Sequence, residues 1–378
     1  MKVEQRCWTP SIGWDVSVPR CLDDRADLVL AFGSKTALQE PTGRERLKAE
    51  CPNACLIGCS TAGEIHGTRV VDNVLAVTAI DFEQAELQKA STEIRGANDS
   101  YDAGRRLAEA LLGDGLTHVL VLCDGLHVNG EELTRGLAAS LPAGVAVTGG
   151  LSADGDNVQQ TLVLLDGSPQ QDTAAAIGFY GNRLKVTVGS MGGWQPFGPE
   201  RIVTRAEGSV LHELDGRPAL ALYESYLGDF AGGLPASSLL FPLSLRTDDP
   251  TRGIIRTVQA IDRERQTITL AGEIPVGAYA RIMQASTDKL VGGAAAAASE
   301  CISEMGNAPD FALLISGAGR RLLMKQRVEE ELEAVRDVFG SSTRLAGFYS
   351  YGEIAPFCQG ERPELHNLTM TVTGFSEN

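Results

Sequence analysis

The chain has 378 residues, of which 43% are hydrophobic and 22% charged, an ordinary composition for a globular protein with a large core. Its net charge of −16 repels phosphate backbones and anionic lipid, so nucleic-acid binding is not expected. The first residues lack the apolar segment of a signal peptide, and no uncharged apolar run reaches the roughly 18 residues of a membrane helix. We therefore expect a soluble, cytoplasmic protein whose eight cysteines are reduced thiols.

Strands and helices alternate in the first half of the chain. Short apolar runs predict strands, and charged residues with apolar residues at helical spacing predict helices. The predicted strands cover residues 27–33, 55–58, 74–80, 118–123, 145–147, 161–165 and 184–188, and the predicted helices cover 36–51, 101–112 and 131–141. This alternation is typical of an α/β layer arrangement.

The pattern changes in the second half. It predicts a helix at 218–227, an antiparallel hairpin from 254–258 and 267–270, helices at 289–305 and 324–339 around one more strand, and a last strand at 368–372. The fold class that we expect is therefore α/β, with mixed sheets flanked by helices. The glycines, prolines and aromatics of residues 189–199 are typical of a loop and mark the join. We predict two domains, 1–200 and 201–378.

One short phrase occurs near both ends of the chain. Residues 58–65, Gly-Cys-Ser-Thr-Ala-Gly-Glu-Ile, are echoed by residues 347–354, Gly-Phe-Tyr-Ser-Tyr-Gly-Glu-Ile. Each copy is followed by a loop and then by an asparagine, Asn73 or Asn367, before an apolar run. This repetition predicts two related halves that arose by an internal duplication and pack on each other, with equivalent loops at the repeated phrases.

The glutamates of the repeated phrase, Glu64 and Glu353, are predicted to lie where a strand meets a loop. In one interpretation they line a pocket with nearby hydroxyl groups and bind the ammonium or hydroxyl groups of a ligand. In the other, each glutamate accepts hydrogen bonds from its own loop and fixes the turn. Both interpretations require donors, because a buried carboxylate without partners costs about 1–3 kcal/mol or more. Arg320 and Arg69 are candidate donors.

A glycine-rich stretch, residues 149–154, follows the predicted strand at 145–147. It could present amide groups to an anion, or it could be a plain turn, and it does not have the spacing of a phosphate-binding loop. With the two bends it completes the predicted ligand-binding set. The candidates are Ser60, Thr61, Gly63, Glu64, Gly149, Gly150, Ser152, Asp154, Arg320, Tyr349, Ser350, Gly352 and Glu353.

Cys59 or Ser60 could also be a nucleophile, which would make the protein a hydrolase or a transferase. However, Gly-x-Ser-x-x-Gly is one residue longer than the nucleophile elbow of hydrolases, and no obvious general base is spaced for a triad. We therefore expect no catalytic residue and a protein that is not an enzyme, with this activity as an alternative.

Taken together, these pieces resemble the FIST sensory domains of signal-transduction proteins. The resemblance runs from about residue 27 to 375 and rests on the order of several pieces: residues 58–65, Asp124-Gly125-Leu126, Gly149-Gly150 with Asp154, residues 194–199, residues 214–223, residues 347–354, and His366-Asn367 with Thr369. One departure is that Gly317 stands where such proteins often have a cysteine, in Ser-Cys-x-x-Arg.

The resemblance implies a sensor of small molecules, with amino acids proposed as ligands. It also implies an alternative, because some members are haem-binding nitric-oxide sensors that act on a histidine kinase or a cyclic-di-GMP enzyme. His66 and His366 are then the candidate haem ligands, since each lies beside a motif loop. Our main hypothesis is a small ligand bound in a crevice between the halves, whose binding alters their packing and is detected by a separate partner protein.

Overall fold

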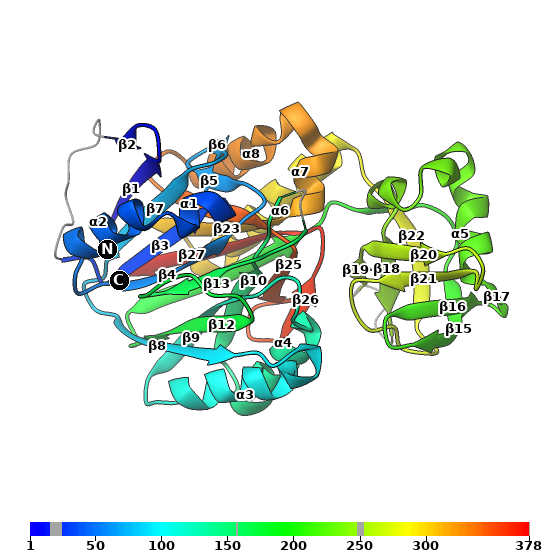
Figure 1. The fold of residues 1–378 in the computed structure, drawn as a ribbon, viewed down its shortest axis with the longest axis horizontal. Coiled ribbons are helices and arrows are strands. Elements are labelled where there is room, and N and C mark those ends of the chain that lie inside the picture. Colours follow the sequence, from blue (N-terminus) through cyan, green and yellow to red (C-terminus); the bar gives the residue numbers. More distant parts are fainter. Residues whose placement is uncertain (16–24, 156–157, 248–252, 378) are drawn as a thin grey trace.

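The computed structural model describes residues 1–15, 25–155, 158–247 and 253–377. Three six-stranded sheets with flanking helices form a body, and a nine-stranded sheet forms a smaller part that stands apart from it (Figure 1). Both termini lie in the body, where the amino group of Met1 is 3.3 Å from the carboxylate of Glu377. None of the described helices is long and apolar enough to cross a membrane.

The first sheet has the strand order β11-β4-β3-β7-β1-β2. Its strands are β1 (Lys2–Thr9), β2 (Gly13–Trp14), β3 (Leu28–Gly33), β4 (Cys55–Ser60), β7 (Leu75–Asp81) and β11 (Val163–Leu165). β3 and β4 are parallel and are connected by α1 (Lys35–Gln39) and α2 (Pro41–Glu50). The predicted single helix is broken in two because Pro41 begins a new helix, as proline favours the first helical position.

The second sheet has the order β26-β25-β10-β9-β12-β8 and is covered by two helices. Its elements are β8 (Glu86–Glu93), α3 (Ser100–Leu111), β9 (Leu116–Cys123), α4 (Gly130–Ser140), β10 (Ala146–Leu151), β12 (Thr173–Tyr180), β25 (Gly352–Pro356) and β26 (Pro363–His366). The sequence pattern did not predict β12. Thr173–Tyr180 is a wholly buried segment of eight residues in which small alanines take the place of the larger apolar residues that mark the other strands. It did predict a loop at Gly149 and Gly150, and this was wrong: both glycines lie within β10.

The third sheet has the order β13-β27-β23-β24-β5-β6. Its elements are β5 (Glu64–His66), β6 (Arg69–Val71), β13 (Leu184–Met191), α6 (Thr287–Met305), β23 (Phe311–Gly317), α7 (Ala318–Met324), α8 (Glu329–Phe339), β24 (Arg344–Ser350) and β27 (Met370–Glu377). Short 3₁₀ helices occur at Ala97–Asp99, Gly228–Gly233, Ala236–Leu240 and Lys325–Arg327.

The three sheets of the body repeat one unit. In each, two parallel strands lie beside a third, antiparallel strand: β3, β4 and β7; β9, β10 and β12; β23, β24 and β27. Equivalent glycines, Gly58, Gly149 and Gly347, lie against the neighbouring parallel strand, where a Cβ would overlap a carbonyl oxygen. The repeat that was visible in the sequence therefore has a third copy at residues 149–155.

Each unit also gives a strand to the sheet of another unit. After β4 the chain enters the third sheet as β5 beside β24, and after β24 it enters the second sheet as β25 beside β10. After β10 it enters the first sheet as β11 beside β4. This exchange closes a ring of three sheets around a shared core of aromatic and aliphatic side chains, among them Phe32, Leu122 and Phe348. The units therefore fold as one body.

The nine-stranded sheet is inserted between β13 and α6, and we call residues 195–284 the inserted domain. Its elements are β14 (Gln195–Pro196), β15 (Arg201–Glu207), β16 (Val210–Leu214), β17 (Arg217–Pro218), α5 (Ala219–Leu227), β18 (Leu243–Arg246), β19 (Ile254–Arg256), β20 (Val258–Asp262), β21 (Thr267–Leu270) and β22 (Tyr279–Gln284). It has a core of its own, which includes Leu220, Tyr223 and Ile268. The predicted hairpin at 254–258 is shifted, since β20 pairs with β21 and β19 pairs with β18.

The predicted α/β class, with mixed sheets flanked by helices, is confirmed. The division into domains at residues 200 and 201 stays a prediction. In the structure the chain leaves the body after β13 and returns to it with α6, so the body contains residues from both ends of the sequence.

Candidate ligand-binding cleft

A cleft of about 1200 Å³ lies between the body and the inserted domain. The body side is formed at the carboxyl ends of β9, β10, β23 and β24, by residues that include Gly125, Leu151, Gly317 and Ser350. The inserted domain contributes Ser209, Leu239, Thr257, Gln259, Gly272 and Glu273. The carboxyl ends of parallel strands are where α/β proteins commonly bind ligands, and the volume suits a metabolite-sized molecule.

The second glutamate bend lines this cleft. Glu353 is fully buried and accepts hydrogen bonds from three donors: Ser350 Oγ to Oε1 at 2.9 Å, and Thr369 N and Oγ1 to Oε2 at 2.9 and 2.7 Å. Burial raises the pKa of Glu353 to about 7, although these hydrogen bonds act in the opposite direction. The carboxyl group is therefore held in place and titrates near neutral pH.

The first glutamate bend has the same internal contact and a different environment. Thr61 Oγ1 donates to Glu64 Oε1 at 2.7 Å, as Ser350 does to Glu353. Glu64 Oε2 is buried and has no hydrogen-bond partner among the described residues. Burial raises the pKa of Glu64 to about 8, so the carboxyl group is largely protonated at neutral pH. Glu64 is not among the residues that line the cleft, whereas its neighbour Ala62 is.

The third copy of the bend has no glutamate. Gly155 stands at the position of Glu64 and Glu353, and Ser152, at the hydroxyl position, donates to the carbonyl of Cys123 at 3.0 Å. Asp154 accepts from the backbone N–H of Gln160 at 3.1 Å and lies 3.4 Å from Lys35 Nζ. In this copy, therefore, Ser152 and Asp154 hold the loop, and Gly155 lines the cleft.

Arg320 and Tyr349 serve the packing of the body. Both are fully buried, and both bond to the carboxylate of Glu331 on α8, with Arg320 Nη2 at 2.8 Å and Tyr349 Oη at 2.7 Å. The arginine that lines the cleft is the next residue, Arg321, which donates to the carbonyl of Ala62 and, at 2.6 Å, to Asp72. A Cβ at Gly63 would overlap the Arg321 guanidinium, so Gly63 leaves room for that side chain.

The two candidate nucleophiles are buried away from the cleft. Ser60 Oγ accepts from the backbone N–H of Leu162 at 2.9 Å and so holds β11 beside β4. Burial raises the pKa of the Cys59 thiol well above its ordinary value. Neither residue lines the cleft. This geometry gives a nucleophilic mechanism no support.

The candidate haem ligands do not fit a haem in this cleft. His366 is buried, and its Nε2 lies 3.1 Å from the carbonyl oxygen of Ala355. Burial lowers the pKa of His366 to about 4. His66 lies in β5, opposite Ala346 and Arg69, and neither histidine lines the cleft. Haem binding stays a prediction, and neither of these two histidines lies in the lining of the cleft.

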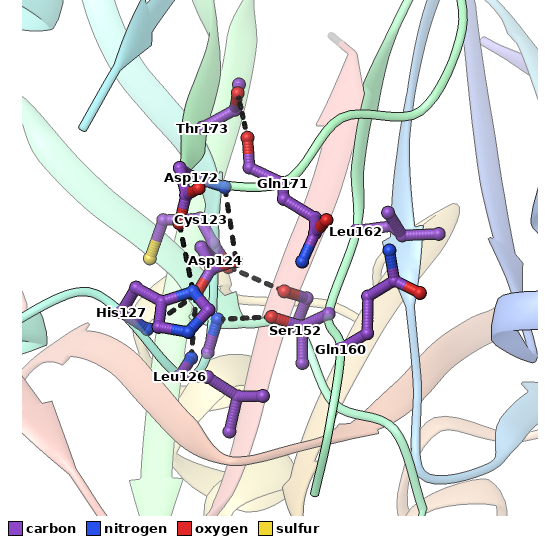
Figure 2. Close-up of polar contacts among 12 residues, drawn as sticks. Cys123, Asp124, Leu126, His127, Ser152, Gln160, Leu162, Gln171, Asp172 and Thr173 are labelled. Atoms are coloured by element: carbon purple, nitrogen blue, oxygen red, sulfur yellow. Dashed lines mark hydrogen bonds and ion pairs between the residues drawn. The ribbon is translucent and has the colours of Figure 1, made fainter. Parts of the chain in front are cut away.

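One group of side chains beside the cleft has the composition of a metal site. Figure 2 shows His127 next to Asp124 and Asp172, and His127 Nδ1 lies 2.9 Å from Asp172 Oδ1. Asp124 Oδ1 accepts the backbone N–H groups of Leu126 and His127 at 2.8 and 2.7 Å. Asp124 thus fixes the turn at the end of β9, and the exposed pair of His127 and Asp172 covers it.

Sequence reasoning missed several residues of the cleft, in particular Arg321, Lys325 and Asn367. Asn367 is 4% exposed, and its Oδ1 has no hydrogen-bond partner among the described residues. Its position directly before Leu368 and Thr369, in a piece that carries the family resemblance, was the available signal. The wall formed by the inserted domain had no signal, since it depends on how two parts of the chain pack.

The protein is thus an α/β protein with a cleft between the body and the inserted domain. Comparison with known families gives the class: residues 27–217 match the FIST N domain and residues 219–356 match the FIST C domain. The chain therefore belongs to the FIST family, whose domains are sensory domains of signal transduction.

Two proteins with similar sequences are themselves uncharacterized. The chain is 27% identical to the uncharacterized protein Rv0628c of Mycobacterium tuberculosis strain H37Rv over 347 residues, which cover 87% of this chain and 85% of the relative. It is also 27% identical to the uncharacterized protein MJ1623 of Methanocaldococcus jannaschii over 203 residues, 49% of this chain and 37% of that protein.

Two solved structures show a distant likeness. A cyanuric acid hydrolase from A. caulinodans aligns over 99% of both chains with 9% identity and a TM-score of 0.39. A chorismatase aligns over 99% of this chain and 98% of its own, with 8% identity and a TM-score of 0.34. At these TM-scores neither likeness supports a conclusion about the fold or the activity of this chain.

Proposed function

We propose that this protein is a sensor that binds a small polar molecule in the cleft between the body and the inserted domain. The observation that carries the proposal is the cleft itself, a volume of about 1200 Å³ with walls from both parts. Pockets of several hundred Å³ at domain interfaces and at strand ends are the usual sites for metabolites. Membership of a family of sensory domains supports the same proposal.

The side chains of the cleft suit a ligand with polar groups of both kinds. Arg321 and Lys325 provide cationic groups, while Asp72, Glu273 and Glu353 provide carboxyl groups. Amino acids and similar zwitterions have complementary charges, and they are the first compounds to test. Each charge pair formed in a partly enclosed cleft is stronger than the same pair in water.

Apolar and polar contacts join the inserted domain to the body, and Ile255 and Met283 pack with Leu368 of the body. Trp194, the residue directly before the inserted domain, donates from Nε1 to the carbonyl of Leu368 at 2.9 Å, and Arg256 Nη1 of the inserted domain donates to the carbonyl of Leu365 at 2.8 Å. Glu131 Oε2, at the start of α4, accepts from Arg256 Nη2 at 3.2 Å and from the backbone N–H of Glu273 at 3.0 Å.

A ligand that touches both walls adds contacts that exist in only one arrangement of the two parts. It would therefore shift the population toward that arrangement. In this proposal a separate protein detects the shift, and a histidine kinase or a cyclic-di-GMP enzyme is the class of partner to test first.

The test is a thermal-shift screen of amino acids and related metabolites on three proteins. Gln259→Trp places a large side chain in the cleft, because Gln259 is exposed and lines it. Ala260→Trp is the matched control, because Ala260 is the next residue of β20, is exposed, and does not line the cleft. We expect compounds that stabilise the wild type and Ala260→Trp and have a much smaller effect on Gln259→Trp. The proposal would be contradicted if no compound raises the melting temperature of the wild type, or if the stabilising compounds raise that of Gln259→Trp by the same amount.

A further inference from the structure

Two residues on the body side of the cleft carry hydrogen-bond acceptors, Asn367 and Glu353. The first is Oδ1 of Asn367, a side chain that lines the cleft, is 4% exposed and lacks a partner for this oxygen among the described residues. Leaving a buried carbonyl oxygen unpaired costs about 1–3 kcal/mol. Such an atom is retained more readily when a bound molecule supplies the missing donor.

The second acceptor is Glu353, which lies on the strand paired with the segment that leads to Asn367. In the pairing of β25 with β26, Glu353 lies opposite His366, the residue before Asn367. Thr369, two residues after Asn367, provides both donors to Glu353 Oε2. Oε1 receives only the hydroxyl of Ser350 among the described residues, and a carboxylate oxygen can accept two hydrogen bonds.

Arg320 and Arg321, whose side chains could approach this side of the cleft, already donate hydrogen bonds to other groups. Arg320 donates to Glu331 and to the carbonyl oxygens of Gly192 and Leu290. Arg321 donates to Ala62 and Asp72. Gly317 packs closely against this part of the body, since a Cβ there would come within 2.9 Å of the Leu368 backbone and 3.1 Å of Glu353 Oε1. A bound molecule with an N–H group can therefore supply the donor that Asn367 Oδ1 lacks.

We infer that the ligand of the cleft presents a nitrogen with N–H donors to Asn367 Oδ1 and Glu353 Oε1, and that Asn367 determines this specificity. The chemical class is a primary amine, an amidine or an amino-substituted heterocycle. A molecule with only acceptors at the same position would leave Asn367 Oδ1 unpaired. This inference rests on the proposed function and adds which end of the ligand the body recognises.

Matched compounds test the inference on the full chain. Benzamidine and benzoate have the same shape, but benzamidine carries N–H donors and benzoate carries acceptors only; butylamine and butyrate form a second pair. Binding to the wild type, Asn367→Leu, Asn367→Asp and Ala260→Leu is measured by isothermal titration calorimetry, with the melting temperature of each protein recorded without ligand.

We expect the donor compounds to bind the wild type and the acceptor compounds to bind at least about tenfold more weakly, as the loss of paired polar contacts predicts. Asn367→Leu should lose about tenfold in affinity for the donor compounds, with a melting temperature equal to or above that of the wild type, because the unpaired oxygen is gone. Asn367→Asp should bind the cationic compounds more tightly, and Ala260→Leu, at an exposed position that does not line the cleft, should leave the preference for donors unchanged.

Equal affinity for the members of each pair, or undiminished binding to Asn367→Leu, would overturn the inference. If the metabolite screen finds cleft ligands that lack N–H groups at their polar end, the inference fails and the proposed function stands. If neither the matched compounds nor the metabolites of the screen bind in the cleft, the inference and the proposed function both fail.

Discussion

The two glutamate bends of the body have the same local structure and different surroundings. In both, the hydroxyl three residues before the glutamate donates to its Oε1. Glu353 then receives two further hydrogen bonds from Thr369 and lines the cleft, whereas Glu64 Oε2 is buried with no partner among the described residues. The shared contact therefore fixes the turn, and the differing contacts decide which copy can serve a ligand. Of the two interpretations drawn from the sequence, fixing the turn applies to both bends and ligand binding is proposed for one.

The largest expected effect concerns what the two bends share. Gly58→Ala and Gly347→Ala should each destabilise the protein by about 3 kcal/mol or more, since the new Cβ would overlap the carbonyl oxygen of Ala31 or Leu314 on the adjacent parallel strand. Urea unfolding measures the change. Gly292→Ala is the control: this glycine lies in α6 with open space around its Cβ position, so a gain of about 0.5–1 kcal/mol is expected. A mild effect at only one of the two glycines would show that the copies are not equivalent.

The next effect is a dependence of stability on pH that arises from the raised pKa of Glu64. Its pKa in the folded protein is raised to about 8, so between pH 4.5 and 8 the unfolded chain loses a proton that the folded protein keeps. The free energy of unfolding therefore falls as pH rises through this window and levels off above it. Glu64→Gln removes this titration and keeps the shape of the protonated side chain.

The variant and the wild type should be about equally stable near pH 5, and the variant should be more stable by on the order of 2 kcal/mol near pH 8. Melting temperatures measured across this range test the expectation. Glu86→Gln, at an exposed position of β8, should run parallel to the wild type throughout. A difference between Glu64→Gln and the wild type that stays constant with pH would mean that Glu64 is ionised in the folded protein.

A smaller effect is expected where Glu353 differs from Glu64. Thr369→Val keeps the shape of the side chain and removes the hydroxyl that donates to Glu353 Oε2 at 2.7 Å. The loss of one hydrogen bond to a buried carboxylate should cost about 1–2 kcal/mol. Thr204→Val, at an exposed position of the inserted domain, serves as the control, because among the described residues its hydroxyl accepts only from the backbone N–H of Gly216. If the two variants lose the same free energy of unfolding, the hydrogen bond to Glu353 stabilises the protein no more than the exposed one does.

The sequence predicted the parts of the molecule that depend on local pattern. The apolar runs of β3, β4, β7 and β9 and the helical spacing of α3 and α4 were recognised within a few residues. The repeated phrase correctly marked equivalent bends, because glycine is required wherever a Cβ would meet the neighbouring strand. The third copy was missed because glycine and serine are nearly all that it shares with the others.

Features that depend on the exchange of strands could not be predicted. The pairing of β3 with β7 and of β23 with β27 makes Leu75 equivalent to Met370, so Asn73 corresponds to Leu368 and not to Asn367. Asn73, Asp172 and Leu368, at equivalent positions, all have positive φ angles, of 59°, 49° and 59°. This offset of one residue matters for the site, since it leaves Asn367 outside the repeat.

The same correspondence between the units leads to the prediction with the smallest expected effect. Val74 occupies in the first unit the place that Thr369 occupies in the third, because each directly precedes the equivalent residues Leu75 and Met370. Val74→Thr therefore offers Glu64 Oε2 the hydroxyl donor that it lacks, and we expect a gain of about 0.5–1 kcal/mol in the free energy of unfolding. The double variant Val74→Thr with Glu64→Gln tests the origin of the gain through a double-mutant cycle. A gain that persists unchanged without the Glu64 carboxyl group would come from β-strand propensity, and the resemblance between the two bends would then end at the hydroxyl that they already share.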